Sequence, residues 1–229
     1  MEPAATLETG CKICVCVPVH CRIPSSIDIY PQLAPHDLDC QWQSNLHRLW
    51  IQVDCKSLAE LCAGRSFLSA PEYRPLFIRI CRSLRTLYNF GLRPVHDSTD
   101  LIIWSPREFN TVADHAVNAA LDSKSTWTRC DEDLLADALL DGKSLRLCLD
   151  GGRRCETRAA IGLALYSVEC SGSGIATYTL LARRGRLLQS VLSAFLAEAV
   201  ALEWGLQYLV ELFKGRVTAT SKSLQGGHP

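Results

Sequence analysis

The chain has 229 residues, and its 24 Lys and Arg residues balance 24 Asp and Glu residues to a formal net charge of zero at pH 7. This balance argues against non-specific nucleic-acid binding through an overall basic field, and it excludes an acidic disordered tail. Because 48% of the residues are apolar, the chain can bury a sizeable core, either as one domain with extensions or as two small domains.

Residues 1–45 form a predicted leader, which contains several prolines and no sustained hydrophobic period. Five potential zinc ligands lie in it: Cys11, Cys14, Cys16, His20 and Cys21. Their spacing is irregular and no second C-x-x-C pair follows to close a tetrahedral site, so a poorly ordered leader is favoured over zinc binding. No small-residue cleavage site follows the short apolar run of the leader, which argues against a secretory signal.

The twelve cysteines are too few for a disulfide scaffold, and several lie in apolar segments where free cysteine behaves as a small hydrophobic residue. They indicate a reducing, intracellular compartment, either the nucleus or the cytoplasm. A membrane location is not expected, because the most apolar stretch, residues 187–213, carries Glu198 and Glu203 near its middle. Each of these charges would cost about 2.5–3.5 kcal/mol at the centre of a bilayer.

In residues 46–121 the spacing of the apolar residues predicts two strands and three helices. In chain order these are a strand at 49–53, a short helix at 57–63, a long helix at 72–90, a strand at 101–104 and a helix at 110–121 with Asn110 as its N-cap. The long helix carries Arg79, Arg82 and Arg85 opposite its apolar face. For this stripe a solvated face is favoured over a ridge that contacts phosphate.

Residues 122–144 are a predicted connector that contains a short amphipathic helix at 131–140. A second block follows, with strands at 145–150, 159–168 and 175–182, the last two paired as a hairpin, and a long helix at 193–213. Residues 214–229 are expected to form a flexible tail.

Four carboxylates lie in apolar surroundings. Asp54 and Asp150 each end an apolar strand, Asp114 lies in the first turns of a helix rich in small residues, and Glu198 lies in a helix that is apolar nearly all round. One such carboxylate is usually a cap or a salt-bridge partner, but four together are typical of a site for hard divalent cations. Two such ions about 3.5–4 Å apart can clamp a phosphodiester, although spacing alone does not show that the four residues converge.

The chain resembles the ribonuclease H superfamily, type 1, in four segments. The family's first strand and hairpin resemble LCLDGGRRCETRAAIGLALY, and its first helix resembles AFLAEAVALEWGLQYL. Its fourth strand is similar to IQVDCKSLAELCAG, and its last strand and helix are similar to WSPREFNTVADHAVNAALD. The W-x-P-R-E-x-N-x-x-A-D motif is the most specific of these, in a form like that of plant-type and retroelement-associated members.

The resemblance covers residues 46–121 and 145–213, but the two halves of the family's domain occur in reverse order. It implies an α/β fold with a five-stranded mixed sheet flanked by helices, circularly permuted. The pieces are complementary, with no element duplicated, and the 122–144 connector is long enough to join them. One permuted domain is therefore favoured over two half-domains that pair between chains.

Carried over residue by residue, the resemblance makes Asp150, Glu198, Asp54 and Asp114 the catalytic carboxylates and the ligands of two Mg²⁺ ions, with Mn²⁺ as an alternative metal. Many members carry a histidine in the loop between the last strand and the last helix, and this loop has no matching residue. His115 could be recruited instead, but a histidine on the helix surface is favoured.

Six residues are expected to contact nucleic acid: Gly151, Gly152, Arg153, Arg154, Arg107 and Asn110. The two glycines would allow the backbone to approach the sugar edge, where 2′-hydroxyls distinguish RNA from DNA. Local charge supports binding, because residues 143–189 hold eight basic and three acidic residues, a balance of +5. Bound Mg²⁺ would neutralise several of the carboxylates, so the zero net charge does not argue against a nucleic-acid partner.

The sequence therefore predicts a divalent-metal-dependent endonuclease that hydrolyses the RNA strand of RNA–DNA hybrids. The alternative is a catalytically silent nucleic-acid-binding domain derived from a retroelement, since folds are often reused without their chemistry. Retention of all four carboxylates favours the enzyme. A cysteine-rich zinc-binding adaptor is a weaker third interpretation.

Overall fold

A computed structural model describes residues 48–94, 100–155, 158–171, 175–189 and 193–225, with side chains described up to residue 215. The predicted leader, including its five potential zinc ligands, lies outside these residues. No helix in the described part of the chain is long and apolar enough to cross a membrane.

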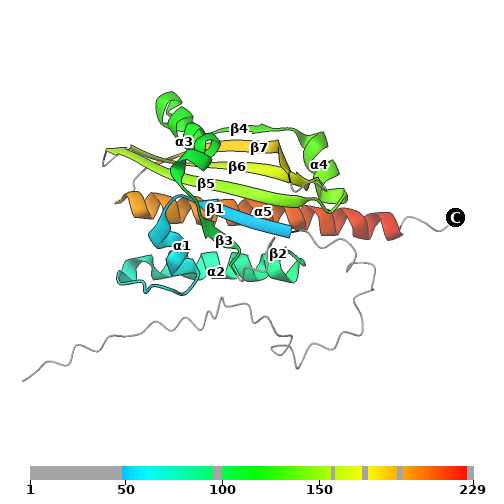
Figure 1. The fold of residues 1–229 in the computed structure, drawn as a ribbon, viewed down its shortest axis with the longest axis horizontal. Helices are drawn as coiled ribbons and strands as arrows, with labels where there is room; N and C mark the ends of the chain where they lie inside the picture. Colours follow the sequence, from blue (N-terminus) through cyan, green and yellow to red (C-terminus); the bar gives the residue numbers. More distant parts are fainter. Residues whose placement is uncertain (1–47, 95–99, 156–157, 172–174, 190–192, 226–229) are drawn as a thin grey trace, which may run out of the picture.

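The described residues form seven strands, five α-helices and two short 3₁₀ turns (Figure 1). The strands are β1 (Arg48–Val53), β2 (Arg93–Pro94), β3 (Ile102–Trp104), β4 (Trp127–Cys130), β5 (Ser144–Cys155), β6 (Arg158–Cys170) and β7 (Ala176–Leu188). The helices are α1 (Lys56–Cys62), α2 (Arg74–Asn89), α3 (Thr111–Ser123), α4 (Glu132–Leu140) and α5 (Ala194–Gln225), with the turns η2 (Pro71–Tyr73) and η3 (Arg107–Phe109).

All described strands belong to one mixed sheet in the order β2-β1-β5-β6-β7-β4, with β3 also paired to β1. β1 runs parallel to β2, β3 and β5, whereas β5, β6, β7 and β4 pair antiparallel. Helices flank the sheet, so the predicted α/β class with a mixed sheet is confirmed. The predicted number of five strands is wrong: β2 and β4 are additional, and both are too short to give a periodic signal.

The two blocks of the sequence meet inside this sheet. β1, from the first block, pairs with β5, from the second, in a register that aligns Leu49 with Leu145 and Val53 with Leu149. Aliphatic residues of both strands alternate onto one face, where they join α2 and α5 in the main hydrophobic core. The smaller helix α3 packs on the opposite face through Ala113, Ala116, Val117 and Ala120, the stripe that the sequence predicts.

Several elements extend beyond their predicted bounds. β5, β6 and β7 are each 12 or 13 residues long, and their outer ends lie where polar and basic residues hide the apolar pattern. Helix α5 continues to Gln225, so residues 214–225, expected as part of a tail, are helical. All three arginines of the predicted solvated stripe are exposed, and Arg79 also makes a salt bridge with Glu203 of α5.

Candidate metal centre

Three of the four predicted carboxylates converge. Asp54 follows the last residue of β1, Asp150 lies within β5, and Glu198 lies near the start of α5. One carboxylate oxygen from each lies within 4.8 Å of the other two. The β1–β5 register explains the first pair: Val53 lies opposite Leu149, so the next residues, Asp54 and Asp150, are neighbours across parallel strands.

Glu198 reaches this pair because helix α5 lies directly against β5. The backbone N–H of Gly151 donates a hydrogen bond to Glu198 Oε2 at 3.1 Å. A Cβ atom at Gly151 would lie only 2.3 Å from the backbone carbon of Ala197, so a larger residue would push the helix away. On the other face, a Cβ at Gly152 would lie 2.6 Å from Val117 of α3. The structure thus gives both glycines, predicted as nucleic-acid contacts, a role in helix packing.

Burial and mutual repulsion keep the carboxyls of Asp150 and Glu198 protonated to unusually high pH. Burial, followed by the negative charges of Asp54 and Asp114, raises the pKa of Asp150 to about 7, against the smaller opposing effects of Arg107 and the Gly151 N–H. Burial, followed by the charges of Asp150 and Asp54, raises the pKa of Glu198 to about 10. At neutral pH the site therefore holds protons that a bound cation would displace.

The donor set fits a hard divalent cation. The three residues offer only oxygen ligands, which Mg²⁺ and Mn²⁺ prefer. Asp54 Oδ1 is buried and has no hydrogen-bond partner among the described residues. A buried carboxylate oxygen without a donor is costly unless a cation satisfies it. The three carboxylates are therefore arranged so that they could hold a metal ion.

Asp114, the fourth predicted ligand, lies outside this cluster. Its carboxylate accepts hydrogen bonds from the guanidinium of Arg107 and from the side-chain amide of Asn118, the latter at 3.0 Å. Its charge nevertheless raises the pKa of Asp150, so the two side chains are electrostatically coupled. The hydrogen bond to Asp114, followed by the charge of Asp114 and then by the charges of Asp150 and Asp54, raises the pKa of Arg107, which places this guanidinium beside the site.

Residues of the W-x-P-R-E-x-N motif hold the segments that carry the carboxylates. The indole N–H of Trp104 donates to the carbonyl oxygen of Asp54 at 3.0 Å. The side-chain amide of Asn110 donates to the carbonyl oxygen of Leu149 at 2.7 Å, directly before Asp150. The motif therefore connects β1, β5 and the start of α3, and Arg107 within it holds Asp114.

Asn110 differs from its prediction in two ways. It occupies the position before α3, but its side chain makes no capping hydrogen bond, because the amide is used on Leu149. It is also only 1% exposed, which is inconsistent with a direct contact to nucleic acid. Asn110 is therefore a positioning residue for β5 and α3.

The remaining predicted contacts lie at the surface. The side chain of Arg107 is 69% exposed. Arg154 pairs with Asp122 at 2.6 Å, and the Nε of half-exposed Arg153 donates to the carbonyl oxygen of Cys155 at 3.1 Å. His115 is exposed on α3. Of these side chains, Arg107 is the one that interacts electrostatically with the three carboxylates.

Sequence reasoning missed a second set of positioning residues. Gln52 donates to the carbonyl oxygen of Phe109 at 3.1 Å and accepts from Arg146, which also donates to that carbonyl at 3.2 Å. These bonds fix η3, which carries Arg107. Gln52 is 2% exposed within an otherwise apolar strand, and this buried polar residue was the signal that could have identified the network.

Comparisons with models of protein families, with curated proteins and with solved structures found no match for this chain, so its interpretation depends on the geometry described above.

Proposed function

We propose that this chain is a divalent-metal-dependent endonuclease that hydrolyses the RNA strand of RNA–DNA hybrids. The observation that carries the proposal is the convergence of Asp54, Asp150 and Glu198, from three separate elements, to within 4.8 Å. The choice of an RNA–DNA hybrid as substrate comes from the motif resemblance, whereas the choice of metal-dependent chemistry comes from the carboxylates themselves.

A circularly permuted ribonuclease H-like fold is part of the proposal. The strands matched to the family's first three are β5, β6 and β7, the fourth matches β1 and the last matches β3. All five belong to one sheet, and β1 pairs directly with β5 within a single chain. This pairing supports intramolecular permutation over half-domains that associate between chains, because each half already has its complement.

The residues have distinct proposed roles. Asp150, Asp54 and Glu198 would hold metal, and Asp114 would contribute to a second ion once Arg107 releases it. Bound Mg²⁺ would supply Lewis-acid activation of a water molecule and of the scissile phosphate. The exposed guanidinium of Arg107 could then pair with a substrate phosphate in place of Asp114. Trp104 and Asn110 would keep the backbone of the two aspartate-bearing strands fixed.

The alternative is a catalytically silent nucleic-acid-binding domain, and one observation favours it. Asp114 is held by Arg107 and Asn118 instead of joining the other three carboxylates. If this salt bridge persists with substrate, a second ion would lack a ligand. The two candidates therefore differ in whether a bound hybrid is cut.

The test is hydrolysis of an end-labelled RNA–DNA hybrid in Mg²⁺, in Mn²⁺ and in EDTA, beside RNA and DNA duplexes of the same sequence. We expect metal-dependent cutting of the RNA strand by the wild-type protein and none by Asp150→Asn or Asp54→Asn. Asp122→Asn is a matched control, because Asp122 lies on the surface of α3 and pairs with Arg154. Binding of the hybrid without cutting would favour the silent domain, and cutting that survives both substitutions would exclude the proposed site.

A further inference from the structure

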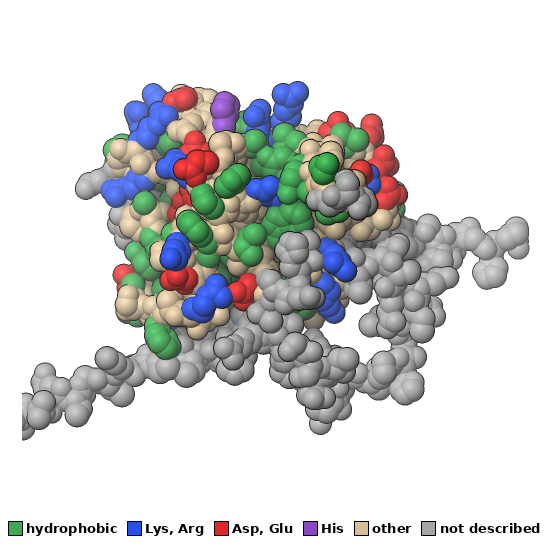
Figure 2. All heavy atoms as spheres, in the orientation of Figure 1, with side chains coloured by type: hydrophobic (Ala, Val, Ile, Leu, Met, Phe, Trp, Pro, Cys, Tyr) green, Lys and Arg blue, Asp and Glu red, His purple; other side chains and the backbone are tan. Residues whose placement is uncertain are grey.

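Part of the sheet face that carries α3 has no described helix over it. Cys148 of β5 packs against Ala113 of α3, so Arg146 and Asp150 lie on the same face by strand alternation. One cross-strand row on this face runs from Trp50 through Arg146 and Tyr166 to Leu180. Figure 2 shows this region, over the strands between α3 and α4, as hydrophobic side chains with basic side chains among them.

Three aromatic rings on this face hold one another in place. The ring of Tyr178 lies 6.4 Å from the rings of Trp50 and Tyr166, edge-to-face with both. The guanidinium of Arg146 lies 5.0 Å from the centre of the Tyr178 ring. Tyr178 is nevertheless 45% exposed. An exposed ring with a fixed orientation is the feature on which unpaired nucleic-acid bases stack.

Arg146 contacts one of these rings, and Arg129 and Arg183 lie in the neighbouring cross-strand row; no acidic residue occupies these two rows. Among the described residues, Arg129, Arg146 and Arg183 make no salt bridge, whereas Arg65, Arg79, Arg107 and Arg154 each do. Arg129 of β4 lies directly opposite Arg183 of β7 in the antiparallel ladder. Like charges placed opposite each other destabilise a sheet, so this pair favours an anion between them.

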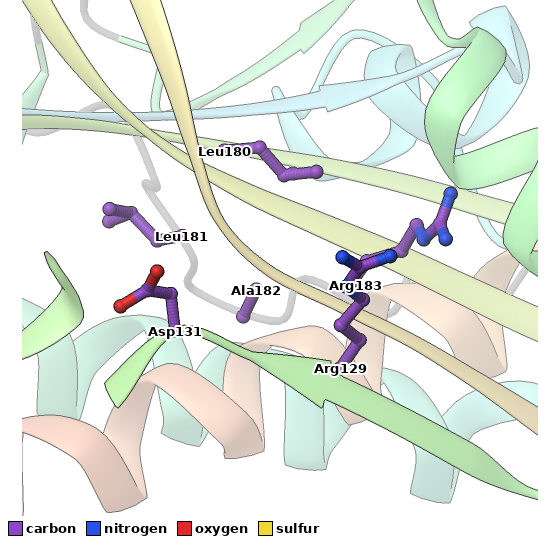
Figure 3. Close-up of a pocket in the computed structure, with 6 residues that line it drawn as sticks. All are labelled: Arg129, Asp131, Leu180, Leu181, Ala182 and Arg183. Carbon is purple, nitrogen blue, oxygen red and sulfur yellow. The ribbon is translucent and has the colours of Figure 1, made fainter. Parts of the chain in front are cut away.

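The two arginines line a pocket of about 330 Å³ at the β4–β7 edge. Figure 3 shows both at one end of the pocket, with the apolar side chains of Leu180 and Leu181 beside it. The hollow occurs where the β6–β7 register shifts, so that Leu181 has no partner across the ladder. The acidic residue at the other end, Asp131, is already used to cap α4 by accepting from Leu134 N at 3.1 Å. The pocket thus combines two cations with an apolar wall, which suits a phosphate joined to a base.

This surface leads to the metal centre. Trp50 and Asp54 are four residues apart along β1, and Arg146 and Asp150 are four apart along β5. Four residues of an extended strand span about 13 Å, which is about two nucleotides of a stretched single strand. Exposed Phe109 lies between the two regions, held over β1 and β5 by Gln52 and Arg146.

We propose that Trp50, Tyr166, Tyr178, Arg129, Arg146 and Arg183 form an arginine–aromatic face that binds single-stranded nucleic acid, such as the unpaired continuation of a hybrid, and directs the adjoining paired part to Asp54, Asp150 and Glu198. The direction toward a cutting site rests on the proposed nuclease function, but the binding does not. A single strand fits better than a duplex, because only unpaired bases can stack on the ring of Tyr178. Arg129, Arg146 and Arg183 make no salt bridge among the described residues, and the pocket's carboxylate, Asp131, already caps α4, which favours a polyanion over an apolar protein segment.

The test is fluorescence anisotropy with a labelled 12-nucleotide oligouridylate and the full chain in EDTA, so that no cutting interferes. We expect Tyr178→Ala to weaken binding about tenfold through loss of stacking, and Tyr178→Phe to bind within about twofold of wild type. Arg129→Glu and Arg183→Glu should each weaken binding at least about tenfold, and each lost phosphate contact should reduce the salt slope by about 0.7. Arg82→Glu on α2 and Phe67→Ala are matched controls away from this face, since both residues are exposed.

Wild-type affinity in Tyr178→Ala, Arg129→Glu and Arg183→Glu would overturn the proposal, as would failure of the wild type to bind. Competition by polyglutamate as strong as that by polyuridylate would assign the surface to acidic proteins instead. Loss of hybrid cutting in Asp150→Asn with oligouridylate binding unchanged keeps the two proposals separate. If the wild type binds the oligonucleotide but does not cut a hybrid, the proposed arginine–aromatic face is supported and the proposed nuclease function is contradicted.

Discussion

Two glutamates on the same apolar helix show how differently a protein can treat a buried carboxylate. Glu203 of α5 is 9% exposed, and its carboxylate accepts hydrogen bonds from Arg79 of α2, at 3.0 Å, and from Gln207. Glu198, five residues earlier, has the backbone N–H of Gly151 and two other carboxylates as neighbours. A carboxylate with its own arginine is satisfied by the fold, whereas a group of carboxylates requires protons or a cation from solution.

The comparison predicts opposite outcomes for one chemical change at the two positions. Glu198→Gln removes a proposed metal ligand and should reduce the rate of hybrid cutting by about 10³-fold or more. Glu203→Gln removes a charge of the same kind from the same helix, but outside the cluster of proposed ligands, and should cut within about threefold of wild type. Single-turnover rates in saturating Mg²⁺ measure both. Similar losses in the two variants would show that α5 as a whole, and not the metal centre, controls activity.

In the absence of metal, removing a carboxylate of the metal centre should stabilise the protein, whereas removing the carboxylate of Glu203 should destabilise it. The pKa of Asp150 is raised to about 7, so the stability associated with its protonated form is fully present below pH 4 and is lost as the pH rises through 7. Asp150→Asn cannot ionise and should increase the free energy of unfolding at pH 8 by about 1–4 kcal/mol. Glu203→Gln should decrease it by about 1 kcal/mol, because Arg79 loses its ionic partner.

Urea unfolding in EDTA between pH 5 and pH 8 measures these differences. The wild-type protein should become less stable over this range, and Asp150→Asn should lose stability less steeply, because only Glu198 then keeps a proton that the unfolded chain releases. Added Mg²⁺ should stabilise the wild type and not Asp150→Asn. A wild type whose stability does not depend on pH here would indicate that the carboxylates are not crowded together in the metal-free protein.

Binding of Mg²⁺ should release protons. Because the pKa of Asp150 is raised to about 7 and that of Glu198 to about 10, the site binds metal in competition with protons. We expect the affinity for Mg²⁺ to fall about tenfold for each pH unit below 7, for each proton displaced. Calorimetric titration in two buffers of different ionisation enthalpy counts the protons released. A count of zero would mean that the metal binds elsewhere.

Much of this site could be predicted from local sequence patterns. Asp54 and Asp150 each follow an apolar run of the sequence, and Glu198 interrupts an apolar helix, so each is recognisable as a carboxylate in apolar surroundings. Their convergence could not be predicted from local patterns, because it depends on the register between β1 and β5, which are distant in sequence. The motif resemblance supplied that link.

Other predictions from the sequence were wrong because local patterns indicate whether a residue is buried, but not which distant residue it contacts. Glu203 shares the apolar context of Glu198 and differs only in facing Arg79 from another helix. Asn110 occupies a position typical of a helix N-cap, but its side-chain amide donates its hydrogen bond to the carbonyl oxygen of Leu149 on β5. β4 is four residues long and forms only because β7 extends far enough to pair with it.

The smallest predicted effect concerns two arginines: Arg107, beside the metal centre, and Arg79, beside Glu203. Arg107 lowers the pKa of Asp150, so Arg107→Gln should raise it further and move the pH midpoint of Mg²⁺ binding upward. Arg107 is 69% exposed, so solvent and salt screen its charge, and we expect a shift of about half a pH unit that disappears in high salt. Arg79→Gln removes the guanidinium from Glu203 and should leave the midpoint unchanged. Equal shifts in the two variants would mean that overall charge, and not the position of Arg107 beside Asp114 and Asp150, sets the affinity for the metal.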